Sequence, residues 1–167
     1  MNADDRMTPF HKAHSTELAG MHDNPSGDDR FYNNLFVERG DLSPYDAASL
    51  PVWMNGNVFL KGAKPSKHEK DPLCKPEFDP AIKLVEKADG LHLEVTLDKA
   101  WSTQRTRQLV TTDLLGKANI PGLPYENPDA SPLKINTDYF GKKRNEANPT
   151  AGPFENPGTG PLSLKVR

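Results

Sequence analysis

The chain has 167 residues, and its 21 basic and 23 acidic side chains leave a formal net charge of −2. This length fits one domain or little more, and the even charge balance excludes a strongly basic nucleic-acid binder and a polybasic membrane anchor. Leu, Ile, Val and Phe make up only about a fifth of the residues. We therefore expect a chain that folds around a thin hydrophobic core.

The 16 prolines and 12 glycines exclude an all-α fold and favour short strands joined by irregular loops. Cys74 is the single cysteine, which rules out an internal disulfide and a cysteine-type zinc site, and it is interpreted as a plain loop or pocket thiol. The N-terminus lacks the apolar run of a signal peptide, and no stretch approaches a membrane span. As written, the chain is expected to be cytoplasmic and without membrane contact.

Residues 1–30 are polar and show no sustained period, so they are predicted to be loop. Residues 31–37 (FYNNLFV) predict a strand, interrupted by Asn33 and Asn34. Asparagine is poor in strands but tolerates left-handed backbone, so this pair suits a bend in a coil of stacked strands.

Residues 57–61 predict a second strand, followed by a lysine-rich loop that runs to residue 80. The clearest local signal is a hairpin, with arms at residues 82–87 and 91–97 around Asp89 and Gly90. In its second arm, apolar residues alternate with polar ones, which predicts one buried face.

Further strands are predicted at residues 109–112, 114–120, 133–140 and 162–166. Between residues 141 and 161 the prolines recur at intervals of four, which is typical of an extended strap over a surface. Together these elements predict about seven short strands and no helix.

Five segments carry a resemblance to a known family: residues 8–17 (TPFHKAHSTE), 27–36 (GDDRFYNNLF), 55–63 (NGNVFLKGA), 108–112 (QLVTT) and 137–144 (TDYFGKKR). They resemble the late part of right-handed parallel β-helix glycoside hydrolases, most closely the family 120 β-xylosidases. The resemblance runs nearly end to end along this chain, whereas those enzymes are several hundred residues long.

The resemblance implies an all-β fold in two parts. Residues 1–50 would form the end of the parallel β-helix with a substrate-side loop, and residues 51–167 a β-rich, sandwich-like closing region with long Pro-rich loops. The upstream β-helix of the same parent chain would be its partner, because a coil without neighbours leaves strand edges and apolar surface uncovered.

The resemblance also implies a retaining mechanism that uses an Asp and a Glu, both expected upstream of Met1. This chain would then be an incomplete and inactive part of an enzyme, with no metal or other cofactor. Within the chain, Glu17 is the candidate catalytic residue. Stacked rungs lie about 4.8 Å apart, close to the carboxyl separation that retention requires, and this register pairs Glu17 with Glu38 or Asp41.

His14, Asp28, Asp29 and Arg30 are the candidate substrate-binding residues. In the functional interpretation, Arg30 and His14 bind sugar hydroxyls beside a carboxylate. In the structural alternative, the two aspartates cap the turn at Gly27 and Arg30 pairs with one of them. The aromatic residues Trp53, Trp101, Tyr125 and Tyr139 could stack on a sugar or simply fill the core.

Two functions follow from these observations. The first is the C-terminal portion of a glycoside hydrolase that cleaves xylosyl or arabinosyl linkages of plant cell-wall polysaccharide. Its substrate would be an oligosaccharide, and the protein could form a homo-oligomer. The alternative is a non-catalytic β module for carbohydrate binding or subunit contact. In-frame β repeats encoded upstream of Met1 would favour the first, whereas a genuine stop there would favour the second.

Overall fold

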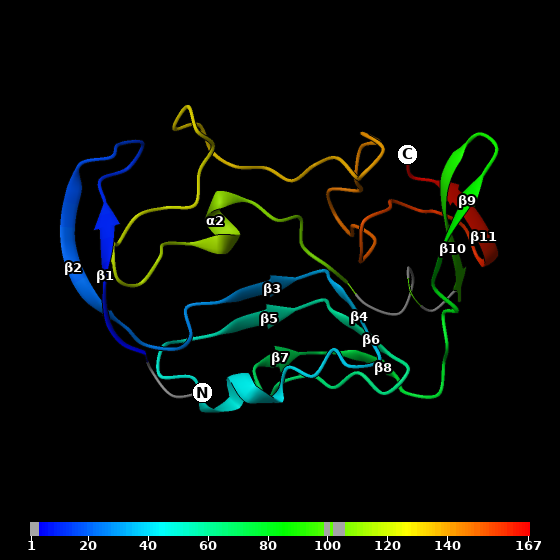
Figure 1. Ribbon diagram of the computed structural model, residues 1–167, viewed down its shortest axis with the longest axis horizontal. Helices are drawn as coiled ribbons and strands as arrows, with labels where there is room; N and C mark the ends of the chain where they lie inside the picture. Colours follow the sequence, from blue (N-terminus) through cyan, green and yellow to red (C-terminus); the bar gives the residue numbers. More distant parts are fainter. Residues whose placement is uncertain (1–3, 99–100, 102–105) are drawn as a thin grey trace.

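The structure is a computed structural model that describes residues 4–98, 101 and 106–167. The described residues are nearly all β or irregular, and their strands fall into four small sheets. Two antiparallel sheets lie at opposite ends of the molecule, and two parallel sheets lie between them (Figure 1). The all-β class is confirmed at this level. No helix of the described part is long and apolar enough to cross a bilayer.

The N-terminal region is a hairpin, so the prediction of a loop over residues 1–30 is wrong. Strand β1 (Asp4–His11) pairs antiparallel with β2 (Leu18–Asn24). Most of the hairpin is exposed, and Met7, Leu18 and Met21 each keep about half of their surface. Because neither face is fully buried, the sequence shows no alternation of apolar and polar residues, which is the signal that identifies a strand.

The middle of the molecule consists of two three-stranded parallel sheets. One contains β3 (Arg30–Tyr32), β5 (Trp53–Asn55) and β7 (Glu69–Lys70), in that order; the other contains β4 (Leu35–Val37), β6 (Val58–Leu60) and β8 (Leu73–Lys75). The predicted strand at residues 57–61 is confirmed as β6. The predicted lysine-rich loop is partly wrong, because β7 and β8 lie within it.

The chain bends at equivalent places in all three layers. The predicted strand at residues 31–37 is two strands, and the bend between them lies at the asparagine pair, as expected. Asn33 has φ 58°, and its counterparts Gly56 and Asp71 have φ 72° and 57°. Asn, Gly and Asp are the residue types that adopt left-handed backbone most readily, so each layer bends where such a residue stands.

A buried polar network ties the three layers together at this bend. Asn57 is fully buried, and its amide nitrogen Nδ2 donates to the Phe31 carbonyl (2.7 Å) and to Glu69 Oε2 (2.5 Å). Its Oδ1 accepts from the Asn34 backbone N–H (2.8 Å) and from Asn34 Nδ2 (3.1 Å). Burial raises the pKa of the Glu69 carboxyl, although the two hydrogen bonds from Asn57 counteract this rise.

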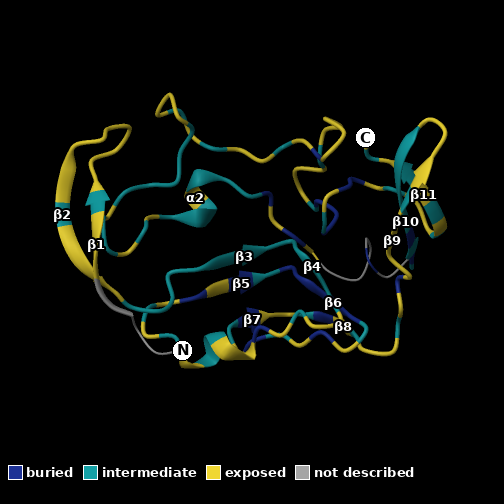
Figure 2. Ribbon diagram, in the orientation of Figure 1, coloured by how far each residue is buried: buried dark blue, intermediate teal, exposed yellow. Residues whose placement is uncertain are grey.

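Two hydrophobic clusters flank strand β6, whose side chains point alternately to either side. On one side, Phe59 packs with Met54, Leu42 and Val52. Its ring stacks on that of Phe36, with 5.2 Å between the ring centroids. On the other side, Val58, Leu60 and Leu73 pack against Val95, Leu97 and Trp101. Figure 2 shows the buried residues concentrated along β6 and the segments facing it, with the N-terminal hairpin largely exposed.

A three-stranded antiparallel sheet covers the second cluster. It contains β9 (Lys83–Lys87), β10 (Gly90–Leu97) and β11 (Gly160–Lys165), with β10 in the centre. The predicted hairpin at Asp89 and Gly90 is confirmed, as is the C-terminal strand. Gly90 has φ 131°, which only glycine adopts without strain.

Most of residues 106–159 form an irregular strap that arches above β3 (Figure 1). The predicted strands at residues 109–112, 114–120 and 133–140 are wrong: these stretches contain only isolated bridges and α2 (Thr112–Leu115). The prolines at positions 121, 124, 128 and 132 lie between these stretches and lack the N–H that a sheet ladder needs, so the chain forms no continuous ladder across this region. A second short helical turn, η1 (Ser43–Ala47), closes the chain between β4 and β5.

Asp138 organises the far end of the strap. Its Oδ1 accepts from the backbone N–H groups of Phe140 and Lys142 (both 2.9 Å), and Oδ2 accepts from Glu155 N–H (2.9 Å). Burial alone would raise its pKa, but these hydrogen bonds outweigh that effect and hold the pKa below the ordinary 3.8. The ionised form of Asp138 is therefore the one that the fold stabilises.

We accordingly expect Asp138→Asn to lower the free energy of unfolding by about 1 to 3 kcal/mol at pH 7. Because the pKa is lowered in the folded state, the contribution of Asp138 is complete above 3.8 and disappears as the pH falls below it. Urea unfolding of both proteins at pH 7, 4 and 2.5 measures this: the difference should shrink with acid. A difference that does not change with pH would contradict the assignment.

Candidate functional site

Arg30 is the centre of the polar cluster that the sequence singled out. Its Nε donates to the Leu115 carbonyl and its Nη2 to the Lys117 carbonyl, both at 2.6 Å. Nη1 donates to the carbonyl and to Oδ1 of Asp28, at 2.6 and 2.7 Å. The guanidinium lies over the ring of Trp53 at 4.1 Å and over that of Tyr125 at 4.7 Å.

These contacts give Asp28 and Arg30 a structural role. The second oxygen of Asp28 accepts from the Asn119 backbone N–H at 2.7 Å, so both residues fasten the strap to β3. Each nitrogen of the Arg30 guanidinium already donates to a protein oxygen. The structural interpretation therefore accounts for the two residues, and their direct contact with a sugar stays a prediction.

Asp29 is the member of the cluster whose carboxylate is available. Its side chain accepts no hydrogen bond from the described residues, while its backbone carbonyl accepts from Trp53 N–H (3.0 Å). Burial raises the pKa of Asp29, and the negative charge of Asp28 adds to the rise. Burial likewise raises the pKa of Tyr45, with the charge of Asp29 contributing. A half-buried carboxyl beside aromatic rings suits either hydrogen bonding to a sugar hydroxyl or proton transfer.

His14 belongs to the same region but has a different partner. Its Nε2 lies 2.7 Å from Glu126 Oε1, which connects the loop of the N-terminal hairpin to the strap. Tyr125, the neighbour of Glu126, covers Arg30, so His14 and Arg30 flank one stretch of strap. A shallow hollow of about 310 Å³ lies beside His14 and Tyr125.

Glu17 lies in the hairpin loop and forms an exposed ion pair with Lys12 at 2.5 Å. The register pairings with Glu38 or Asp41 are not formed in the structure. Glu38 follows β4, far along the molecule from the hairpin (Figure 1), and is paired with Lys61 at 2.5 Å. Asp41 accepts a hydrogen bond from the Ser43 backbone N–H. In the described ranges, no group of three or more His, Cys, Asp or Glu is placed to hold a metal ion.

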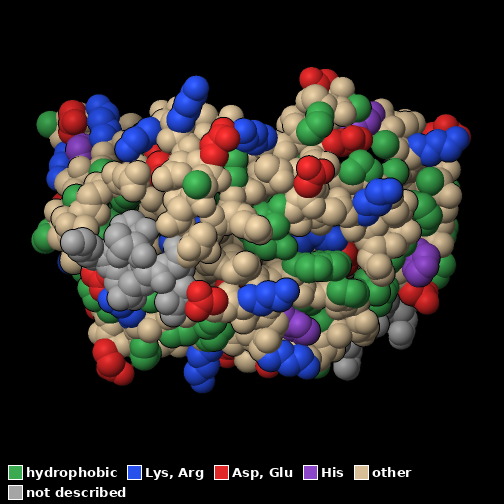
Figure 3. Space-filling view, turned by 180° about the vertical axis from the view of Figure 1, so that it is seen from behind, with side chains coloured by type: hydrophobic (Ala, Val, Ile, Leu, Met, Phe, Trp, Pro, Cys, Tyr) green, Lys and Arg blue, Asp and Glu red, His purple; other side chains and the backbone are tan. Residues whose placement is uncertain are grey.

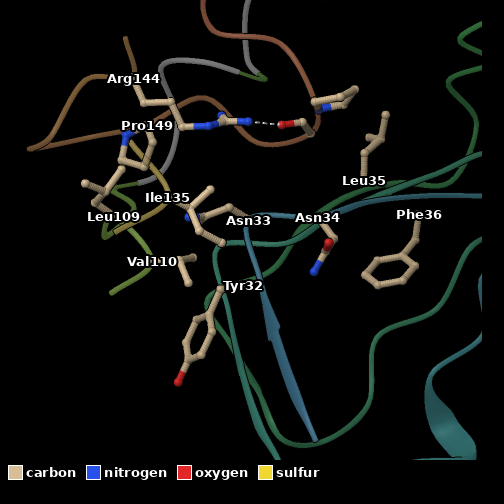
Figure 4. A pocket seen from close by; sticks show the side chains of 12 residues that line it. Tyr32, Asn33, Asn34, Leu35, Phe36, Leu109, Val110, Ile135, Arg144 and Pro149 are labelled. Atoms are coloured by element: carbon tan, nitrogen blue, oxygen red, sulfur yellow. Dashed lines mark hydrogen bonds between the residues drawn. The ribbon is translucent and has the colours of Figure 1, made fainter. Parts of the chain in front are cut away.

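A cavity of about 500 Å³ separates the bend between β3 and β4 from the strap. Tyr32, Asn33 and Phe36 form its floor, and Leu109, Val110 and Ile135 face them from the strap (Figure 4). Arg144 closes one side through hydrogen bonds to the carbonyls of Thr150 and Gly152, both 2.9 Å. The sequence carries no signal for this cavity, because its two walls come from segments that are far apart along the chain.

One face of the molecule carries charges of both signs. In the view from behind, acidic and basic side chains are interspersed rather than gathered by sign (Figure 3). This view agrees with the net charge of −2. A small net charge and mixed signs on this face give no strong overall field that would attract a highly charged partner.

Comparison with known proteins places the fold. No family model matches the chain, and no curated protein matches it either. A solved structure described as the complex of XylC with xylose is 31% identical, with a TM-score of 0.88 over 98% of this chain. The chain has a XylC-related fold. It spans only 30% of the length of the XylC chain.

Proposed function

We propose that this chain is the C-terminal portion of a glycoside hydrolase that acts on xylose-type linkages, with arabinosyl linkages as the related alternative. The similarity to XylC, which was solved with xylose, is the observation that carries the proposal. It agrees with the resemblance of five sequence segments to family 120 β-xylosidases. An oligosaccharide would be the substrate.

We also propose that the two parallel sheets are terminal coils of a right-handed parallel β-helix. Three layers with left-handed residues at matched bends support this. On either side of β3, the Asp29 carbonyl and the Asn33 N–H form hydrogen bonds with β5. Backbone groups alternate in direction along a strand, so those of Arg30 and Tyr32 point away from β5, to the outer edge of the sheet. Preceding coils of the parent chain would pair there, and the apolar cavity under the strap would receive their side chains. In this proposal the coils continue through β8, which ends at Lys75, beyond the division at residue 50 that the resemblance implied.

In this proposal, the Asp and the Glu of the retaining pair both lie in the upstream part of the parent chain. Glu17 remains the proposed catalytic residue of this chain, and His14, Asp28, Asp29 and Arg30 its proposed substrate-binding residues. Of these, Asp29 has the least occupied side chain. The ion pair of Glu17 with Lys12 favours the alternative, a non-catalytic carbohydrate-binding module, for this part of the parent.

The proposal is tested with nitrophenyl xyloside and arabinoside substrates. We expect the purified chain to hydrolyse neither, because the carboxylate pair is incomplete, and the full-length parent to hydrolyse at least one. Turnover by the chain alone would contradict the division of the active site. Inactivity of a folded full-length parent on both substrates would favour the non-catalytic module.

Glu17→Gln in the full-length parent separates catalysis from folding. If Glu17 acts on substrate, kcat falls at least a hundredfold while the melting temperature changes little. Lys12→Gln is the matched control, since it breaks the same ion pair without removing the carboxylate. If the two variants have equal activity, Glu17 is an ordinary surface residue and takes no part in catalysis.

A further inference from the structure

The outer face of the sheet β3, β5 and β7 carries a second set of polar and aromatic side chains. The register pairs Arg30 with Trp53 and Tyr32 with Asn55. It also pairs Met54 with Glu69, and both of these are buried on the inner face. Side chains alternate along a strand, so Arg30, Trp53 and His68 share the outer face with Tyr32, Asn55 and Lys70.

These outer side chains line a groove of about 510 Å³. Its lining includes Tyr32, Trp53, Asn55, His68, Lys70 and Gln108. Within the described part of the chain, the side chains of Asn55 and Gln108 form no hydrogen bond, and neither does the Tyr32 hydroxyl. The groove therefore offers amide and hydroxyl groups that are free to bind a ligand, as recognition of a polyhydroxyl compound requires.

Trp53 supplies a fixed apolar surface at this groove. Its side chain is 37% exposed, yet the Arg30 guanidinium holds one side of the ring at 4.1 Å. Arg30 itself is held by backbone carbonyls, so the ring is immobilised before any ligand arrives. A rigid, partly exposed indole loses little conformational entropy when it packs against the C–H face of a sugar ring.

The charge of the groove distinguishes it from a site for a neutral sugar. Lys67, His68 and Lys70 line it, and no Asp or Glu does. Outside the lining, the Asp46 carboxylate accepts hydrogen bonds from Ser66 Oγ (2.6 Å) and the Lys67 backbone N–H (2.8 Å), and the charges of Lys67 and His68 help to lower its pKa. Because the lining itself contains no acidic side chain, an anionic group in the groove would meet Lys70 without an acidic neighbour in the lining, while Lys67 and His68 are shared with Asp46.

We propose that this groove binds a saccharide unit that carries a carboxylate, that is, a uronic acid residue. The aromatic ring and the amides recognise the sugar, and the lysines recognise the carboxylate. This goes beyond the proposed function, since xylose is neutral, and it requires no catalytic residue. It rests on the proposed function only in that the ligand is a saccharide.

Three methyl β-glycosides test the proposal, because they differ only in the group on ring carbon 5: xyloside (hydrogen), glucoside (hydroxymethyl) and glucuronide (carboxylate). We expect isothermal titration of the 167-residue chain to show at least tenfold tighter binding of the glucuronide at low salt. Raising the salt from about 0.05 to 0.5 M should reduce this preference several-fold, because exposed charges are screened. Equal affinity for all three, or no binding of the glucuronide, would overturn the proposal.

Two variants locate the binding site. Lys70→Glu should weaken glucuronide binding at least tenfold, whereas Lys83→Glu on the exposed β9 strand changes the net charge equally and should leave binding unchanged. Trp53→Phe keeps an aromatic ring and should weaken the binding of every glycoside that binds. Circular dichroism melts verify that each variant is folded. Equal effects of the two lysine variants would place binding elsewhere, and inactivity of the full-length parent on xylosides leaves this result unaffected.

Discussion

Replacing Asn57 by alanine should lower the free energy of unfolding by about 3 to 5 kcal/mol. The side chain of Asn57 is fully buried and contacts all three layers of the parallel sheets. Its removal leaves the part-buried Asn34 N–H and a buried Glu69 oxygen without their partner. A buried group that loses its hydrogen bond costs the full desolvation penalty, and the Glu69 carboxyl costs more because its pKa is already raised by burial.

Asn55→Ala is the matched control for this experiment. Asn55 lies two residues earlier, on the outer face of β5, and its side chain forms no hydrogen bond with the described residues. Urea unfolding should show a change of at most about 1 kcal/mol for Asn55→Ala. If both variants lose the same stability, the buried network is not what joins the layers.

Arg30→Lys is the second substitution with a large expected effect, about 2 to 4 kcal/mol of lost stability. Lysine keeps the positive charge but cannot reach the Leu115 and Lys117 carbonyls and Asp28 at once. It also lacks the planar group that lies between Trp53 and Tyr125. The strap would therefore lose several of its attachments to β3.

This substitution also distinguishes the two interpretations of Arg30. A structural role predicts a lower melting temperature and faster proteolysis of the strap near residues 115–125, as seen by limited trypsin digestion. Arg39→Lys, at an exposed position after β4, serves as the control and should leave both unchanged. An unchanged melting temperature for Arg30→Lys, together with weaker sugar binding, would instead assign Arg30 to substrate recognition.

The local sequence was sufficient to predict the structure where a residue type strongly prefers one backbone conformation. Asp89 and Gly90 predict the turn of the closing hairpin, because glycine accepts its positive φ. The asparagine pair likewise predicts the bend between β3 and β4. The later layers bend at Gly56 and Asp71, and comparing these residues with Asn33 could have revealed β5, β7 and β8.

Local signals failed where long-range contacts decide the conformation. The β1–β2 hairpin carries no period because both of its faces are largely exposed. The strap contains apolar stretches that resemble strands, yet side-chain bonds such as those of Asp138 and Arg30 hold it in an irregular course. For the candidate site, the sequence identified Asp28 and Arg30 as a cluster but could not show that Trp53 and Tyr125 enclose the guanidinium.

By itself, the sequence determined the all-β class, the closing hairpin and the bend at Asn33 and Asn34. Each of these features depends on the backbone preferences of a few neighbouring residues, and these preferences follow from the residue types. Only the tertiary structure decided which carboxylates are occupied, that Glu17 and Glu38 lie apart, and that a basic, aromatic groove covers the outer sheet face. Those features join residues that are far apart in the chain, and their positions depend on how the parallel layers stack.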